Sequence, residues 1–290
     1  MRIFLLARLS SRLGDRCRYP LRVMANKESN ISGGVKKELR IEAGFVCPYP
    51  GCGSPFLTFH HFDPPRHVED HNRPEGMIAL CREHHGFADQ GHYTNEQLKD
   101  WKSNPKGVSN SERQSLPWLR KDPIVVVGSI YTRFVPSLFR FRGHESLWLS
   151  RDDDGNVFLN MGMSTFTDNP MILLSDNCWA YDQLPVDVVC PPGGKRLKVS
   201  YETGDYVDLL FHTYDSQNDL EKQFPVLDVE KAQFFEIEFP IAVMTIKGNF
   251  GNGDLVLHPG KLQFRKDGKD VLMGNNFLMR STGPIIRYDG

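Results

Sequence analysis

Residues 47–89 read CPYPGCGSPFLTFHHFDPPRHVEDHNRPEGMIALCREHHGFAD, and they hold three of the six cysteines and six of the ten histidines of a 290-residue chain. Cysteine and histidine are preferred ligands of transition metals in proteins. Their concentration in one short stretch indicates that bound metal, rather than a large apolar core, organises this part of the fold.

Two short pairs in this stretch have the spacing of a structural zinc site. Cys47 and Cys52 flank a turn rich in proline and glycine, and Cys81 and His84 lie at the start of a helix expected over about residues 80–90. Soft ligands from two separate turns form a closed tetrahedral site. We therefore expect these four residues to bind zinc. The alternative is buried free cysteines beside an unrelated pair.

The remaining histidines suit a second metal. Residues 58–62 (TFHHF) have the pattern of a strand, in which neighbouring side chains point to opposite faces, so one histidine of the pair can bind a metal while the other turns elsewhere. His85 and Asp89 are four residues apart on the expected helix and share a face. Three protein ligands leave positions open for water and phosphate, as a catalytic metal requires.

From about residue 35 to residue 101, a quarter of the chain, the sequence resembles the HNH (His-Asn-His) endonucleases, which share the ββα-metal fold. The resemblance rests on the adjacent histidines at 60 and 61, on the run IALCREHH at 78–85 and on the zinc-binding pairs. It implies that the catalytic ion is bound by His60, His85 and Asp89, and that His61 is the general base.

One position departs from the family. Its central asparagine normally braces the loop and helps to orient the base, and this chain has Gly76 at that point. We expect Asn72, just upstream in the same loop, to take over the bracing, with backbone groups as the alternative. If neither does so, the resemblance implies a slow or inactive module.

The implied reaction is hydrolysis of a phosphodiester bond. A divalent cation polarises the scissile phosphate, and a neutral imidazole with a reference pKa of about 6.5 takes a proton from the attacking water. Imidazole and carboxylate ligands suit Mg²⁺, Mn²⁺, Ni²⁺ or Zn²⁺. Arg66, Arg73 and Arg82 flank the expected site. They are candidates for phosphate contacts, with a solvated rim as the alternative.

Charge is distributed unevenly along the chain. The formal net charge is −1, which gives no overall attraction to nucleic acid. Residues 1–40 nevertheless carry ten Lys and Arg against three Asp and Glu, whereas residues 121–290 carry 17 against 23. The basic extension, residues 1–34, is expected to be disordered or to contain a misassigned start. Residues 1–23 resemble a transit peptide in composition, or they lie upstream of a true start at Met24, which is the interpretation that we favour.

No stretch is apolar enough over sufficient length to span a bilayer, so we expect no membrane partner. The cysteines outside the cluster are scattered rather than paired, which favours a reducing compartment and hence the cytoplasm.

The rest of the chain has the pattern of a β-rich domain. A helix over residues 93–102, capped by Thr94 and Gln97, is expected to close the module at residues 35–102. A linker over 103–117 and a β domain over 118–290 follow. Alternating apolar residues, for example at 197–201, 207–211, 234–239 and 241–246, predict eight to twelve strands in a mostly antiparallel sandwich or barrel. The expected fold class is therefore α+β.

These features together lead us to expect a metal-dependent DNA endonuclease whose β domain recognises substrate, effector or partner. A noncatalytic, zinc-stapled module that binds nucleic acid or protein is the main alternative, and an RNase or toxin nuclease is the second.

Overall fold

The structure is a computed structural model that describes residues 31–107, 114–115, 122–141, 144–164, 170–175, 178–180, 185–251, 253, 255–258, 260–266, 269–274, 277–279 and 286–288. It contains both helices and sheets, which confirms the α+β class. Residues 1–30, with the favoured start at Met24, lie outside the described residues, as do residues 108–113 and 116–117 of the expected linker. The first helix begins at Gly33, just before the expected module boundary.

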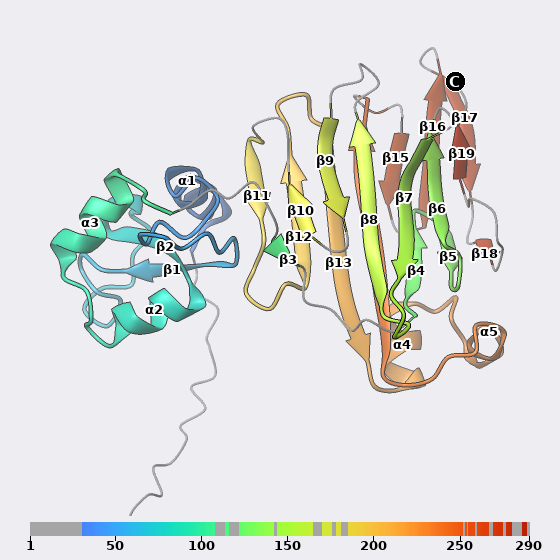
Figure 1. The fold of residues 1–290 in the computed structure, drawn as a ribbon, viewed down its shortest axis with the longest axis horizontal. Coiled ribbons are helices and arrows are strands. Elements are labelled where there is room, and N and C mark those ends of the chain that lie inside the picture. The colour runs from blue at the N-terminus through green and yellow to red at the C-terminus, as the bar shows by residue number, and fades with distance from the viewer. Residues whose placement is uncertain are drawn as a thin grey trace, which may run out of the picture. The chain divides into compact units, whose positions relative to one another are not determined.

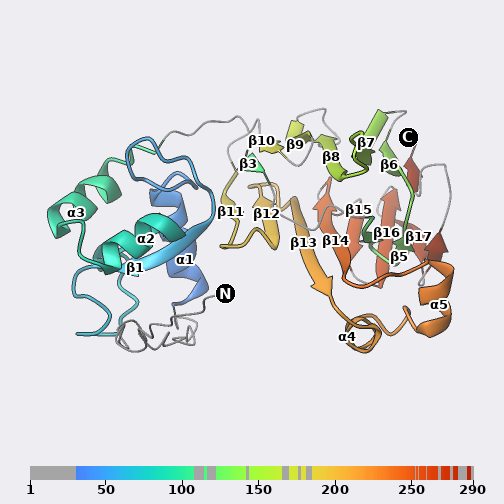
Figure 2. The same ribbon diagram turned by 60° about the horizontal axis from the view of Figure 1, so that its bottom comes forward.

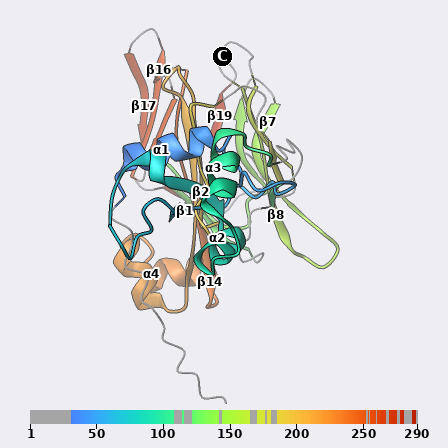
Figure 3. The ribbon, with the colours of Figure 1, turned by 90° about the vertical axis from the view of Figure 1, so that its left-hand side faces the viewer.

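The stretch rich in cysteine and histidine lies among the first elements of the fold: α1 (Gly33–Glu42), β1 (Leu57–His61), the 3₁₀ helix η1 (Pro74–Gly76), β2 (Met77–Cys81), α2 (Arg82–Asp89) and α3 (Asn95–Ser103). Strands β1 and β2 are antiparallel, with Leu57 opposite Cys81 and His61 opposite Met77. Helices α1, α2 and α3 all contact this strand pair (Figure 3). Every residue of β2 is buried.

A side-chain cap explains where α3 begins. The Thr94 hydroxyl accepts from the Gln97 backbone N–H, and the Gln97 side chain accepts from the Thr94 N–H. This reciprocal pair satisfies two backbone donors that would otherwise lack partners, and it confirms the helix predicted from these two residues. Leu98 and Trp101 of α3 are buried and add to a small apolar core around the strand pair.

The β-rich part has a seven-stranded sheet and a ten-stranded sheet, both mostly antiparallel. The first contains β3 (Gln114–Ser115), β6 (Ser137–Phe141), β7 (His144–Arg151), β8 (Val157–Ser164), β9 (Pro170–Ser175), β10 (Cys178–Ala180) and β19 (Ile286–Tyr288). The second contains β4 (Ile124–Val127), β5 (Ile130–Thr132), β11 (Asp187–Val189), β12 (Arg196–Ser200), β13 (Tyr206–Tyr214), β14 (Ile241–Phe250), β15 (Leu255–His258), β16 (Lys261–Lys266), β17 (Lys269–Gly274) and β18 (Phe277–Met279).

The two sheets lie in two layers (Figures 1 and 2) and share one core. Side chains of both sheets point into it, such as Leu147 and Leu159 from one and Leu209 and Ile246 from the other. A separate apolar cluster lies at one end of the ten-stranded sheet. The segment that bears the short helices α4 (Gln217–Gln223) and α5 (Val229–Phe234) covers this cluster.

Three features differ from the sequence-based expectations. The strand predicted over 234–239 is wrong, because α5 occupies 229–234 and a turn follows, so the aromatic residues there cover a sheet end instead. Among the described residues, the two sheets have more strands than the eight to twelve predicted, since several strands have only two to four residues. Strand β3 also lies within the stretch expected to be a linker.

Among the described residues, no helix has the length and apolar character needed to cross a membrane.

Candidate metal centres

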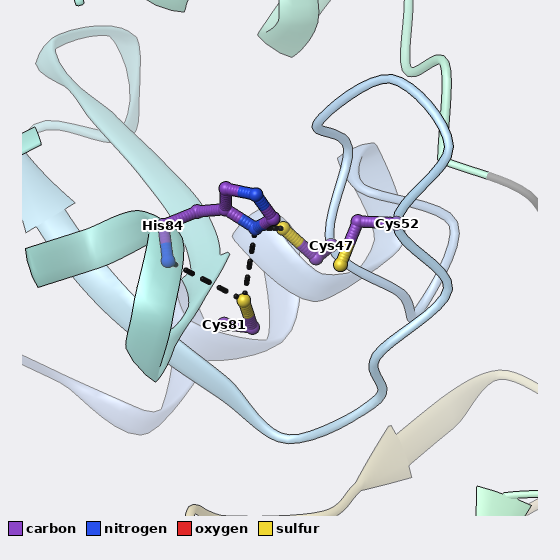
Figure 4. A group of neighbouring side chains, drawn as sticks. All are labelled: Cys47, Cys52, Cys81 and His84. Atoms are coloured by element: carbon purple, nitrogen blue, oxygen red, sulfur yellow. Dashed lines mark hydrogen bonds between the residues drawn. The ribbon is translucent and has the colours of Figure 1, made fainter. Parts of the chain in front are cut away.

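The first donor group brings together Cys47, Cys52, Cys81 and His84 (Figure 4). One ligand atom from each lies within 4.8 Å of the others, close enough to hold a metal ion. Nδ1 of His84 is 3.0 Å from Sγ of Cys81 and 3.5 Å from Sγ of Cys47. A tetrahedral ion with ordinary Zn–S and Zn–N bonds separates sulfur from nitrogen by about 3.6 Å, so the group fits zinc with little adjustment.

Local structure prepares this group for a cation. Cys81 ends β2 and caps α2, where its sulfur accepts from the His84 backbone N–H. A hydrogen bond from the Cys47 thiol lowers the pKa of Cys81, and the same interaction raises the pKa of Cys47. Burial raises the pKa of Cys52. Three neighbouring sulfurs therefore cannot all ionise unless a cation compensates their charge, as a bound metal does.

Aromatic rings and returning backbone enclose the first group. Tyr49, between the two cysteines of the turn, stacks on the His84 ring with centroids 3.9 Å apart, and Trp101 of α3 meets Tyr49 edge-on. After α3 the chain returns to the turn, where the Lys106 N–H donates to the Pro48 carbonyl. These contacts hold the ligand-bearing turn against α2 and α3.

The second donor group contains His60 from β1 with His85 and Asp89 from α2, and its ligand atoms also lie within 4.8 Å of one another. Nδ1 of His60 is 3.1 Å from Oδ1 of Asp89, and Nε2 of His85 is 3.6 Å from the same oxygen. Burial and the neighbouring His85 lower the pKa of His60 to about 4, and burial lowers the pKa of His85. Both rings are therefore neutral at pH 7 and keep a lone pair for a metal.

Thr58 fixes the orientation of His85. The Thr58 hydroxyl donates to the Leu80 carbonyl at 2.9 Å, so its oxygen accepts at 2.7 Å from Nδ1 of His85. The proton of the neutral ring then resides on Nδ1, and Nε2 presents its lone pair to His60 and Asp89. This chain of hydrogen bonds is the kind of support that metal-binding histidines use to hold one tautomer.

His61 lies on the opposite face of β1 and is only 5% exposed. Its Nε2 is 2.9 Å from the carbonyl oxygen of His71. Because a carbonyl oxygen can only accept, Nε2 carries the proton and Nδ1 the lone pair in the neutral ring. Burial lowers the pKa of His61, which keeps the ring neutral at pH 7.

The loop between β1 and β2 is braced by the His71 ring. This ring is buried, with Nε2 donating to the Pro64 carbonyl at 3.2 Å and Nδ1 accepting from the Arg73 N–H at 3.1 Å. Asn72 is exposed, and its Oδ1 accepts instead from the Ser32 N–H, next to α1. The hydrogen bond of Asn72 thus joins the loop to the start of α1, and its bracing of the base stays a prediction.

Close backbone contact explains Gly76. Its carbonyl accepts from the N–H groups of both Phe62 and Asp63, which draws the two ends of the loop together. A Cβ at position 76 would collide with the Asp63 carbonyl oxygen. An asparagine there would thus require the loop to open, which accounts for the glycine at this position.

Two of the three arginines expected to contact phosphate are paired with carboxylates. Arg73 makes two 2.8 Å hydrogen bonds to Glu69, and Arg66 lies 3.5 Å from Asp70. Arg82 is exposed at the start of α2. Exposed ion pairs of this kind contribute little to stability, so phosphate can exchange with the carboxylates.

Sequence reasoning missed Thr58 and His71. A signal existed for Thr58, because residues two apart on a strand share a face and Thr58 precedes His60 by two. No comparable signal existed for His71, since its role depends on how the loop closes around Pro64.

Comparison of the chain with protein-family models, with curated proteins and with solved structures finds no match in any of the three.

Loss of the first donor group is expected to unfold its surroundings. Structural zinc contributes about 10–16 kcal/mol to the folding of small zinc modules, so Cys81→Ser should remove zinc and expose the β1–β2 amides to hydrogen exchange. Zinc content by mass spectrometry and exchange rates measure this effect. Cys190→Ala, which alters a buried cysteine of the β core, is the control and should retain zinc. Unchanged zinc in Cys81→Ser contradicts the assignment.

Thr58→Val tests the second donor group with nearly unchanged side-chain volume. Without the hydroxyl, Nδ1 of His85 loses its acceptor, and we expect Mn²⁺ to bind about 10–100-fold more weakly while zinc content stays constant. Isothermal titration calorimetry measures the affinity. Thr213→Val, at an exposed position of β13, provides the matched control. Equal Mn²⁺ affinity in both variants argues against a metal at this group.

Proposed function

We propose that the protein is a metal-dependent endonuclease that hydrolyses phosphodiester bonds in DNA, with Cys47, Cys52, Cys81 and His84 holding a structural zinc in an HNH-like ββα module. The observation that carries the proposal is the pairing of two unlike donor groups on one strand pair. The sulfur-rich group has enough ligands to close a tetrahedral shell, whereas the group of His60, His85 and Asp89 has only three. Three ligands leave positions for substrate oxygen.

His61 is proposed as the general base. Its Nδ1 keeps the lone pair because Nε2 donates to the His71 carbonyl, and a neutral imidazole accepts a proton from water. A divalent cation bound by the second group supplies polarisation of the phosphate and stabilisation of the leaving oxygen. The mixed imidazole and carboxylate set is compatible with Mg²⁺, Mn²⁺, Ni²⁺ or Zn²⁺.

The burial of His61 favours the second candidate, a noncatalytic module that binds nucleic acid or protein. A base that is 5% exposed reaches an attacking water only if substrate binding or a small shift of the loop uncovers Nδ1. The hydrogen bonds of His71 hold this loop in place. Activity therefore distinguishes the two candidates.

Cleavage of supercoiled plasmid DNA with added Mg²⁺, Mn²⁺ or Ni²⁺ tests the proposal. We expect His61→Ala to slow cleavage by about 10²–10⁴-fold, the usual contribution of a general base. His67→Ala, an exposed histidine of the same loop, should cleave normally. If wild type and His61→Ala are equally inert with every metal while zinc stays bound, the noncatalytic candidate holds. Faster cleavage of RNA than of DNA in the same assay identifies an RNase.

His71 and Asn72 of the β1–β2 loop are expected to differ in their effect on cleavage. His71→Ala removes two hydrogen bonds that hold the loop against His61, at a cost of about 1–3 kcal/mol for the buried groups left unpaired. We expect its cleavage rate at saturating DNA to fall about 10–100-fold, with Mn²⁺ affinity unchanged, because the His71 carbonyl that keeps the proton on Nε2 of His61 is no longer held in place. Asn72→Ala should stay close to wild type. A larger loss in Asn72→Ala than in His71→Ala reverses the assignment.

A further inference from the structure

The outer face of the ten-stranded sheet carries a row of three lysines, one histidine and one aspartate. Residues opposite one another on neighbouring strands place Lys198 beside Asp208 and Asp208 beside Lys247. On β15, His258 follows Leu257, which pairs with Gly248 of β14. His258 lies opposite Lys261 of β16. We call Lys198, Asp208, Lys247, His258 and Lys261 the basic row.

The row faces away from the core. The sequence neighbours of its members point into the space between the sheets; they are Leu197, Leu209, Ile246, Leu257 and Leu262. Among the described residues, the segment that bears α4 and α5 packs on the same outer face against Ile241 and Val243, toward the start of β14, and against Ile124 and Val126 of β4. Lys198 and Lys247 are partly exposed, and His258 and Lys261 are exposed.

The row has a positive charge that its own carboxylate does not cancel. Asp208 is bound by Arg196 through two 2.8 Å hydrogen bonds, so a cation outside the row already neutralises it. Within the described residues, Lys247 and Lys261 have no ion-pair partner. Their charge therefore remains available to an anion from solution.

An aromatic ring lies among the basic groups. Nζ of Lys198 is 4.8 Å from the centre of the Tyr206 ring, and the Tyr206 hydroxyl meets Nε2 of His258 at 3.3 Å. These contacts order the two basic side chains without adding a negative charge. The face thus combines lysine cations with a phenol hydroxyl and an imidazole ring.

The row is positively charged although the part of the chain that contains it is acidic: residues 121–290 carry 17 Lys and Arg against 23 Asp and Glu. Neighbouring strands are about 4.8 Å apart, so four strand-to-strand steps give the row a length of about 19 Å. A DNA duplex carries one negative charge per about 1.7 Å of its axis. A row of this length can therefore meet several phosphates at once.

We propose that the basic row binds the sugar-phosphate backbone of nucleic acid and forms a second contact surface, on residues distinct from the metal-binding ones. The choice of nucleic acid over another polyanion rests on the proposed function. Charge complementarity supports it, and Tyr206 adds a ring beside the lysines. Such contacts position a strand without reading its sequence.

Binding of a short fluorescein-labelled DNA duplex, followed by anisotropy in a His61→Ala background without added metal, tests the inference. The test variant is Lys247→Gln with Lys261→Gln. The matched control is Lys222→Gln with Lys231→Gln, which removes two lysines that pair with acids in or next to α4 and α5. We expect the test variant to bind DNA at least about tenfold more weakly. Between about 50 and 200 mM salt, the plot of log affinity against log salt concentration should be less steep, by the equivalent of about two phosphate contacts.

The control variant should bind DNA as tightly as the His61→Ala parent protein. Equal binding by all three proteins shows that the row is a solvated face, and equal weakening of both variants shows a general effect of net charge; either result overturns the inference. A third result also overturns it. If the parent binds a polyglutamate peptide and the test variant loses that binding but keeps its affinity for DNA, the row serves an acidic protein partner.

Cleavage separates failure of this inference from failure of the proposed function. With His61 intact, the lysine variant should show a raised KM and an unchanged kcat, because the row contains neither a proposed metal ligand nor the proposed base. If wild type cleaves and the variant has an unchanged KM, only the row is refuted. If wild type binds DNA through the row but never cleaves it, the row stands and the nuclease proposal fails.

Discussion

The antiparallel pairing of β1 with β2 decides where both donor groups lie. Its register puts Cys81 at the end of β2, where it also caps α2 and so directs His84 toward the turn that bears Cys47. One helical residue later, His85 points back to the face of β1 that carries His60. A slip of one residue in this pairing would turn every β1 side chain to the other face. His60 would then no longer lie beside His85 and Asp89.

Proton placement gives the histidines around the second group their chemical character. A neutral imidazole has one donor and one acceptor nitrogen, so a fixed acceptor on one side determines which nitrogen keeps the lone pair. Thr58 has this role for His85, and the His71 carbonyl has it for His61. Neither acceptor carries a charge. The two rings are thus held in one tautomer without an ion pair that a bound cation would have to displace.

The elements that the sequence predicts well are those with a local cause. Helix α3 follows from the reciprocal cap of Thr94 and Gln97, whereas the stretch at 234–239 alternates like a strand and instead covers a sheet end, because tertiary packing outweighs local pattern there. The bracing residue of the β1–β2 loop has no local cause either. His71 and Asn72 are neighbours, and both have side chains able to brace a turn. Only the closed loop leaves a buried position that a ring with two hydrogen-bonding nitrogens fills.

Charge placement limits where the proposed substrate can gain binding energy. The chain is almost neutral, and two of the three arginines near the metal centres are engaged by Glu69 and Asp70. Phosphate contacts at these arginines therefore gain little net energy, since each contact replaces an existing ion pair. Under the proposed function, a nearly neutral protein that acts on a polyanion needs unpaired cations elsewhere, and the proposal assigns that role to the lysines of the basic row. Because their backbone belongs to a paired sheet, ordering them on DNA costs less conformational entropy than ordering a loop.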